Sequence, residues 1–322
     1  MFGIGSYRYE GFLHGQVFLN LLIDNGFLLV VAIGMTFVLL SGGIDLSVGA
    51  VVALSTMIGA SLVEQQNWPP LLAILVVLTL GTVFGLGMGC IIHYFEIQPF
   101  IVTLAGMFLA RGLCYTISID SISITDPVFT RMAQARVRFA GLFVSPSVLI
   151  ALVVLAVAFV VLHYSRLGRT VYAIGGNEQS ALLMGLPVAK TKITVYAISG
   201  FCSALGGVLL TFYMLSGYGQ HALGMELDAI AAVVIGGALL TGGSGYVLGT
   251  LLGVLVLGVI QTIISFEGTL SSWWTRIVIG ILLFVFIVLQ RVIGVRERSA
   301  LSRLSTRSVT EKPAPPRQEV RT

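Results

Sequence analysis

Long apolar stretches separated by short polar breaks run along most of the chain. A helix needs about 20 largely apolar residues to cross a bilayer. Nine stretches of this kind cover residues 20–41, 44–64, 70–93, 97–118, 146–165, 191–216, 226–241, 246–266 and 273–294. The breaks contain residues that end helices, such as Pro69 and Pro70. The pattern predicts an all-α integral membrane protein with about nine or ten transmembrane helices.

The composition supports a chain that lies in a lipid bilayer. Hydrophobic residues make up 57% of the 322 residues and charged residues only 10%, against about 25% in soluble domains. The 38 glycines suit helices that pack closely in a membrane. Cys90, Cys114 and Cys202 lie in apolar stretches without metal-ligand spacing, so neither a metal nor another cofactor is expected.

Basic residues predict the orientation of the chain. Lys and Arg cluster in the connection 166–192 and in the tail 295–322, and the positive-inside rule places both in the cytoplasm. The net charge of +4 therefore indicates topology rather than nucleic-acid binding. The connection 119–145 then lies outside, despite its three arginines. We expect a transmembrane domain over 20–294, a disordered cytoplasmic tail, and a segment 1–19 that is a truncated first span or lies at the membrane surface.

One short segment recurs at a fixed offset. Residues 39–43 read Leu-Leu-Ser-Gly-Gly and residues 239–243 read Leu-Leu-Thr-Gly-Gly, while Gly49 recurs as Gly249. A repeat of this kind is typical of transporters built from two related halves, with the substrate path between them. We therefore expect two related halves.

Ser41, Asp45 and Ser47 surround a glycine pair between two predicted spans. The glycines break one helix, and oxygens of Asp45 and Ser47 can cap the next. Non-helical backbone and a carboxylate are costly inside a membrane and usually functional. Either these side chains line a substrate path, or Asp45 only caps a helix at the cytoplasmic interface.

Further polar residues lie at the predicted span ends. Glu226 and Asp228 begin a predicted helix, where they cap it or line an outer vestibule. Gln261 precedes the tryptophans Trp273 and Trp274. Tryptophans at span ends usually form an interfacial belt, although an aromatic face can also stack on a sugar ring. All five residues are candidates for a substrate path.

The cytoplasmic connection contains a short amphipathic helix. Asn177 can cap it, Glu178 suits its positive end, and Gly185 ends it. Such a helix is a docking element for a cytoplasmic partner, or it lies on the membrane surface without one. The docking candidates are Gly175, Gly176, Asn177, Glu178, Ala181 and Gly185.

Enzymatic chemistry has no recognisable motif in the chain. It lacks the G-x-x-x-x-G-K-[ST] phosphate loop, H-E-x-x-H and G-x-S-x-G. An ion-coupled secondary transporter would need carboxylates at the bilayer midplane, whereas Asp45 and Asp228 fall near predicted span ends. Arg111 lies inside the span 97–118 and is expected to snorkel or to pair with a carboxylate.

Several motifs together resemble one transporter family. Residues 34–49, which include Ser-Gly-Gly-Ile-Asp-Leu-Ser-Val-Gly, resemble the hallmark of ribose-type monosaccharide permeases of ATP-binding-cassette (ABC) importers. Residues 172–177 and 226–231 are similar to later motifs of that family. Residues 103–108 and 268–275 most resemble the permease of a galactofuranose importer. The resemblance covers about residues 20 to 294.

The resemblance implies a function and partners. The chain would be a non-catalytic permease subunit in the bacterial inner membrane, importing a monosaccharide by alternating access. The sugar would be galactofuranose, ribose or another monosaccharide. Expected partners are a cytoplasmic ABC ATPase, a second permease that is a paralogue or a copy, and a periplasmic sugar-binding protein. The family's coupling loop corresponds to residues 175–187, and the family usually has one further N-terminal span.

Overall fold

The structure is a computed structural model that describes residues 15–139, 142–267, 274, 276–286 and 288–289. It is built almost entirely of helices, which confirms the all-α prediction. Seven helices of the described residues are long and apolar enough to cross a membrane. They are α2 (Gly15–Leu40), α3 (Val48–Ala60) with its continuation η1 (Ser61–Gln65), α4 (Pro70–Tyr94), α5 (Pro99–Ile117), α7 (Pro146–Tyr164), α10 (Val188–Met214) and α12 (Val247–Glu267).

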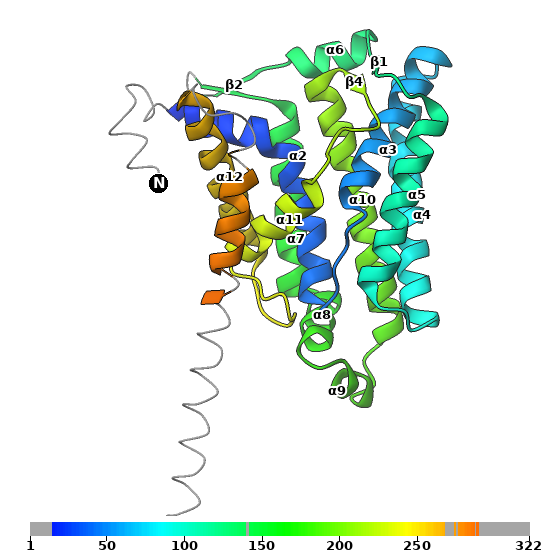
Figure 1. The fold of residues 1–322 in the computed structure, drawn as a ribbon, viewed down its shortest axis with the longest axis vertical. Coiled ribbons are helices and arrows are strands. Elements are labelled where there is room, and N and C mark those ends of the chain that lie inside the picture. Colours follow the sequence, from blue (N-terminus) through cyan, green and yellow to red (C-terminus); the bar gives the residue numbers. More distant parts are fainter. Residues whose placement is uncertain (1–14, 140–141, 268–273, 275, 287, 290–322) are drawn as a thin grey trace, which may run out of the picture.

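The long helices stand side by side, and short elements cover their two ends (Figure 1). At one end lie β1 (Ile122–Ser123), α6 (Pro127–Gln134), β2 (Val137–Phe139), β3 (Leu142–Val144) and β4 (Ser216–Gly217). Strand β1 pairs antiparallel with β4, and β2 with β3. At the other end lie α8 (Arg166–Gly176) and α9 (Glu178–Leu183). The connections 119–145 and 166–192 thus lie at opposite ends, as predicted.

Two predicted spans differ from the helices that the structure has. The span predicted over 44–64 is helical from Val48 to Gln65, whereas residues 43–47 form a coil and a turn. The span predicted over 226–241 is wrong as a single helix: α11 (Met225–Ile235) is too short to cross a bilayer. Gly237 stops it with a left-handed φ of +93°. The non-helical segment 215–224 precedes α11, so helix and loop together replace a full span.

The last predicted span is described only in part. Residues 276–286 form a short apolar helix. Trp273 and the tail 295–322 lie outside the described residues, as does most of the segment 1–19. Residues 15–19 of that segment belong to α2.

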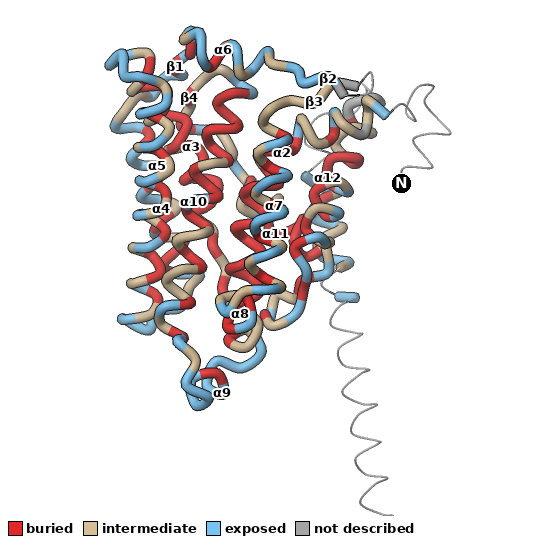
Figure 2. Tube along the Cα trace, turned by 180° about the vertical axis from the view of Figure 1, so that it is seen from behind, coloured by how far each residue is buried: buried red, intermediate tan, exposed pale blue. Residues whose placement is uncertain are grey.

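Glycines let α4 and α10 approach to backbone contact. A Cβ atom on Gly81 would lie 2.8 Å from Gly200 O, and one on Gly200 would lie 3.0 Å from the Cα of Gly85. The glycines on α4 are spaced four apart, so they share one helix face. Buried residues line the inner faces of the helices, while α4 and α5 expose their outer faces (Figure 2). The exposed faces are apolar, as a lipid contact requires.

We expect Gly85→Ala to destabilise the protein, because the added Cβ would overlap the carbonyl oxygen of Tyr196 on α10. The cost should be about 1–3 kcal/mol, as for other overpacked sites. Gly87→Ala is the matched control on the same helix, since nothing lies within 4 Å of its Cβ position. Thermal unfolding in detergent measures both variants, and equal melting temperatures would contradict the close packing of α4 on α10.

Candidate substrate path and docking helix

The two copies of the sequence repeat lie against each other at the end of the bundle that carries α8 and α9. The Gly243 N–H donates a hydrogen bond to Leu40 O at 3.0 Å. Equivalent positions also share a conformation, because Gly42 and Gly242 have left-handed φ angles of +80° and +84°. A Cβ on Gly175 would overlap Leu40 O, so α8 ends against the same junction. The repeat therefore corresponds to one glycine-rich junction of three chain segments.

Asp45 is fully buried and held by three hydrogen bonds. Its Oδ1 accepts from the Ser47 N–H at 2.9 Å and from the Ser47 hydroxyl at 2.6 Å. Its Oδ2 accepts from the Ser199 hydroxyl at 2.7 Å. Ser199 lies about halfway along α10. The expectation that Asp45 lies near a span end is therefore wrong, because the non-helical residues 43–47 place it beside Ser199, level with the middle of α10.

The first turns of α3 and α11 contact each other beside the non-helical segment 43–47, which contains Asp45. A Cβ on Gly49 would lie 2.7 Å from Ala222 O and would overlap the Glu226 carboxylate. Both helices begin here, so their unpaired N–H groups and the positive ends of their dipoles face the same region. Discontinuous helices arranged in this way form substrate sites in other transporters. Glu226, a predicted path residue, lies at this meeting point.

Arg111 on α5 supports the non-helical segment 215–224. Its Nη1 donates to Gly219 O at 2.6 Å and to His221 O at 2.7 Å. These carbonyls belong to no helix and need a donor inside a membrane. The two expectations from sequence were snorkelling and a carboxylate partner; the hydrogen bonds go to backbone carbonyls instead, although Arg111 also interacts electrostatically with the Glu226 carboxylate.

Three buried polar atoms of the described residues have no hydrogen-bond partner: Tyr196 Oη, His221 Nδ1 and Glu226 Oε2. His221 belongs to the non-helical segment 215–224. The Tyr196 hydroxyl lies against Gly43, and the Glu226 carboxylate lies against Gly49 at the start of α3. Buried polar groups usually have a partner, so these atoms mark a place for water or a ligand. Sequence reasoning missed Tyr196 and His221, because a lone tyrosine or histidine in an apolar stretch carries no motif.

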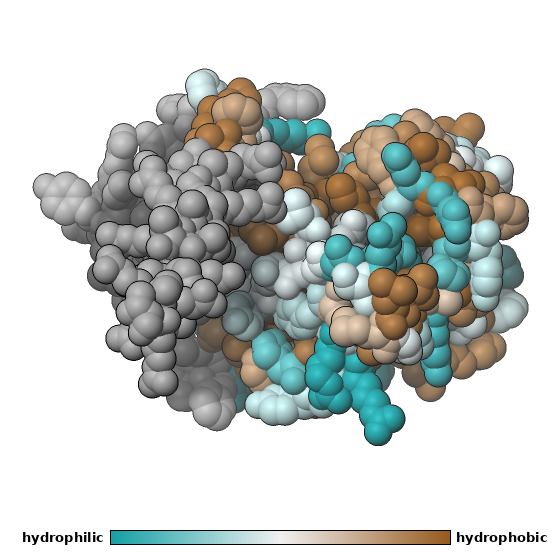
Figure 3. All heavy atoms as spheres, turned by 90° about the horizontal axis from the view of Figure 1, so that it is seen from below, coloured by the Kyte–Doolittle hydropathy of each residue, from teal (hydrophilic) through white to brown (hydrophobic). Residues whose placement is uncertain are grey.

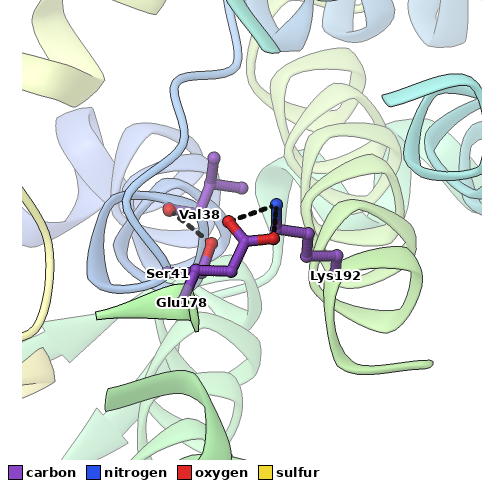
Figure 4. A network of polar contacts seen from close by, with 4 residues as sticks. All are labelled: Val38, Ser41, Glu178 and Lys192. Atoms are coloured by element: carbon purple, nitrogen blue, oxygen red, sulfur yellow. Dashed lines mark hydrogen bonds and ion pairs between the residues drawn. The ribbon is translucent and has the colours of Figure 1, made fainter. Parts of the chain in front are cut away.

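The remaining path candidates occupy other positions, although Asp228 interacts electrostatically with Glu226. The Ser41 hydroxyl donates to Val38 O at 2.8 Å and thus closes the end of α2 (Figure 4). Asp228 follows Glu226 in the first turn of α11. Gln261 lies on α12, away from the broken segments, and Trp274 is exposed.

Helix α9 has the local structure that the sequence predicts. Asn177 caps α9 by accepting from the Ser180 N–H at 2.8 Å. Ala181 is buried beneath the helix. Glu178 forms an ion pair with Lys192 on α10 at 2.6 Å (Figure 4). These contacts fix α9 to the start of α10.

The outer surface of α9 is apolar although it points away from the bundle. Leu182, Leu183 and Met184 are exposed, Leu183 by 88%. Hydrophobic residues stand among hydrophilic ones on the described part of this face (Figure 3). A groove of about 800 Å³ lies beside α9 and the connection between α4 and α5. Gly185 ends the helix region with a left-handed φ of +75°. Exposed apolar patches in water usually mark a protein contact.

Comparisons with known proteins give the family. Residues 17–287 match the family described as the branched-chain amino acid transport system / permease component. The chain is 46% identical to the inner membrane ABC transporter permease protein YjfF of Escherichia coli, over 92% of each chain. It is 42% identical to the fructose import permease protein FruG of Bifidobacterium longum, over 90% of this chain and 85% of FruG. It is 37% identical to the ribose import permease protein RbsC of Escherichia coli, over 84% of each chain. The comparison with solved structures found no significant match.

All three relatives are named as permeases and match most of the chain, and the names of FruG and RbsC specify different sugars. The seven apolar helices agree with a multi-pass protein of the inner membrane. The chain therefore belongs to this permease family and, within it, to the ribose-type sugar permeases of ABC importers.

Proposed function

We propose that this chain carries a monosaccharide, in the first instance galactofuranose, through the membrane between α3, α10 and α11. The observation that supports this path is the set of three buried polar atoms without partners, on Tyr196, His221 and Glu226. The preference for galactofuranose depends on the sequence motifs at 103–108 and 268–275. Ribose and other monosaccharides remain the alternatives.

The region between α3, α10 and α11, called the seam below, has a chemistry that suits an uncharged sugar. Sugar hydroxyls both donate and accept hydrogen bonds, and the seam offers a phenol, an imidazole nitrogen and a carboxylate oxygen. The first turns of α3 and α11 add N–H donors. A sugar between the two helix ends would satisfy groups that the protein leaves unpaired, and release would leave them unpaired again. This difference gives a ligand the means to shift the conformational equilibrium.

Energy would enter through α9. The chain has no phosphate loop, so ATP would be hydrolysed by a cytoplasmic partner subunit that docks on the apolar surface of α9. Gly175 lies directly before α9 in the sequence and packs on Leu40, where α2 ends and the segment with Asp45 begins. A movement of α9 would therefore pass through this backbone contact to the segment that contains Asp45. A second permease and a periplasmic sugar-binding protein on the outer face would complete the importer.

The ion-coupled alternative gains one observation from the structure, since Asp45 lies near mid-depth. A coupling carboxylate must bind and release a cation, however, and this one has three hydrogen bonds and no exposed surface. The family also consists of ABC permeases. We therefore assign Asp45 to the support of the broken segment.

Reconstitution tests the function. The chain is placed in vesicles with the proposed ATPase, second permease and binding protein, and sugar uptake and ATP hydrolysis are measured for galactofuranose, ribose, fructose and galactose. We expect ATP-dependent uptake with galactofuranose preferred. Uphill uptake by the chain alone, abolished by a protonophore, would contradict an ATP-driven importer. ATP-dependent uptake of another sugar would contradict only the preference.

We expect Leu183→Arg to weaken binding of the ATPase subunit, because it places a charge in the proposed apolar contact. Loss of one central apolar contact corresponds to about a tenfold increase in Kd, or about 1.4 kcal/mol. Ile119→Arg makes the same change at an exposed aliphatic residue of the opposite face and should leave the affinity unchanged. Co-purification and a binding titration measure both, and equal affinities would refute docking at α9.

We expect Gly49→Ala to block transport, because the added methyl group would fill the space between α3 and the Glu226 carboxylate. Glu226→Gln should keep the shape but change the hydrogen bonding, and should lower uptake by about tenfold, or about 1.4 kcal/mol. Gly112→Ala on α5 is the control, since nothing lies within 4 Å of its Cβ position. Uptake is measured in assembled complexes, and full activity of Gly49→Ala would rule out this seam as the path.

A further inference from the structure

A second cavity, of about 480 Å³, lies at the cytoplasmic end between α7, α8 and the connection from α11 to α12. It lies on different elements from the seam between α3 and α11, and no step of transport proposed above uses it. Its polar wall includes His163 at the end of α7, Arg169 on α8, and Ser244 and Tyr246 of the connection.

The groups in this cavity suit an anion. Arg169 is exposed and forms no ion pair within the described part of the chain. The His163 Nδ1 lies 3.0 Å from Phe159 O and donates to it, so Nε2 donates to a phosphate oxygen when the imidazole is protonated. The imidazole stacks on the Tyr246 ring, with centroids 5.8 Å apart and an angle of 17° between the planes. The two rings thus form a fixed wall beside one free guanidinium, which favours phosphate oxygens.

A tyrosine holds the opposite wall in place. The Tyr172 hydroxyl donates to Gly245 O at 2.8 Å. Burial raises the pKa of Tyr172 above its ordinary value, and the nearby Tyr246 adds to the increase. The phenol therefore stays a neutral donor at physiological pH. The connection that carries Gly245 also contains Gly243, which bonds to Leu40 at the glycine junction.

The position of the cavity indicates which kind of anion reaches it. It opens where α7 ends at Tyr164, and both Tyr164 and Tyr246 are exposed, as aromatic residues at a membrane interface are. Aliphatic side chains are exposed along the same two helices toward the membrane interior, including Val157 and Val160 on α7 and Leu252 on α12. Helices α7 and α12 contact each other. A ligand with a phosphate and long apolar chains would match both parts of this surface.

We propose that the cavity binds an anionic phospholipid of the inner leaflet, with the phosphate between Arg169 and His163 and the acyl chains along α7 and α12. Basic pockets between helices on the cytoplasmic side bind such headgroups. Because the cavity wall continues into the glycine junction, the bound lipid braces the connection between α11 and α12. A free phosphate ion shares the polar contacts but not the apolar ones.

Native mass spectrometry of the full chain in detergent tests the site. Dioleoyl phosphatidylglycerol and dioleoyl phosphatidylcholine are added in turn, and the bound fraction gives the affinity. We expect the chain to retain phosphatidylglycerol in preference, and Arg169→Gln to bind it about fivefold more weakly, the effect of one basic residue at a membrane surface. Arg166→Gln is the matched control, because Arg166 is exposed on the same helix but does not line the cavity.

Three results would overturn the proposal. They are equal retention of the two lipids, equal affinity of the Arg169 and Arg166 variants, and displacement of phosphatidylglycerol by millimolar inorganic phosphate, which would indicate a site for the free ion. His163→Gln gives an independent reading if Arg169→Gln fails to fold. It should also lower the affinity for phosphatidylglycerol while leaving phosphatidylcholine unchanged.

Discussion

Backbone that leaves a helix inside a bilayer has no water to bond to, and the rest of this structure depends on how that need is met. Among the described residues, the chain is non-helical inside the bundle at residues 43–47 and 215–224. Asp45 and Ser199 secure the first segment to α10, and Arg111 secures the second to α5. The charged groups thus stabilise an irregular backbone, and that backbone leaves other polar atoms unpaired.

In the proposed mechanism, transport and energy supply meet at the glycine junction. The unwound segment with Asp45 begins at the end of α2, and α8 and the connection after α11 touch the same place. Glycine is needed there because backbones approach too closely for a Cβ atom, and Gly242 also has a left-handed φ. The docking helix follows α8 in the sequence. Parts that would otherwise be far apart therefore share one small set of backbone contacts.

The sequence predicts the elements well where a long apolar pattern decides them and poorly where the backbone is irregular. Composition and periodicity predict the seven long helices, and capping rules predict α9. The prediction of a span over 226–241 is wrong because apolar residues continue past the end of α11, so the hydrophobic pattern does not show where the helix ends. The sequence does not show that Asp45 lies beside Ser199, because the course of the non-helical segment 43–47 has no sequence signature. Bonds from Arg111 to backbone carbonyls have no sequence signature.

A sugar path between α3 and α11 is tested most directly by the accessibility of residue 221. In a chain with Cys90→Ser, a cysteine is introduced by His221→Cys, and a membrane-impermeant maleimide is applied to the assembled importer from each side. Cys114 and Cys202 are buried and serve as the internal background. We predict that the side from which the cysteine reacts changes with the nucleotide state of the ATPase, and that the transported sugar slows the reaction. A cysteine that stays unreactive in every state, or whose reactivity is unaffected by sugar, would contradict the path.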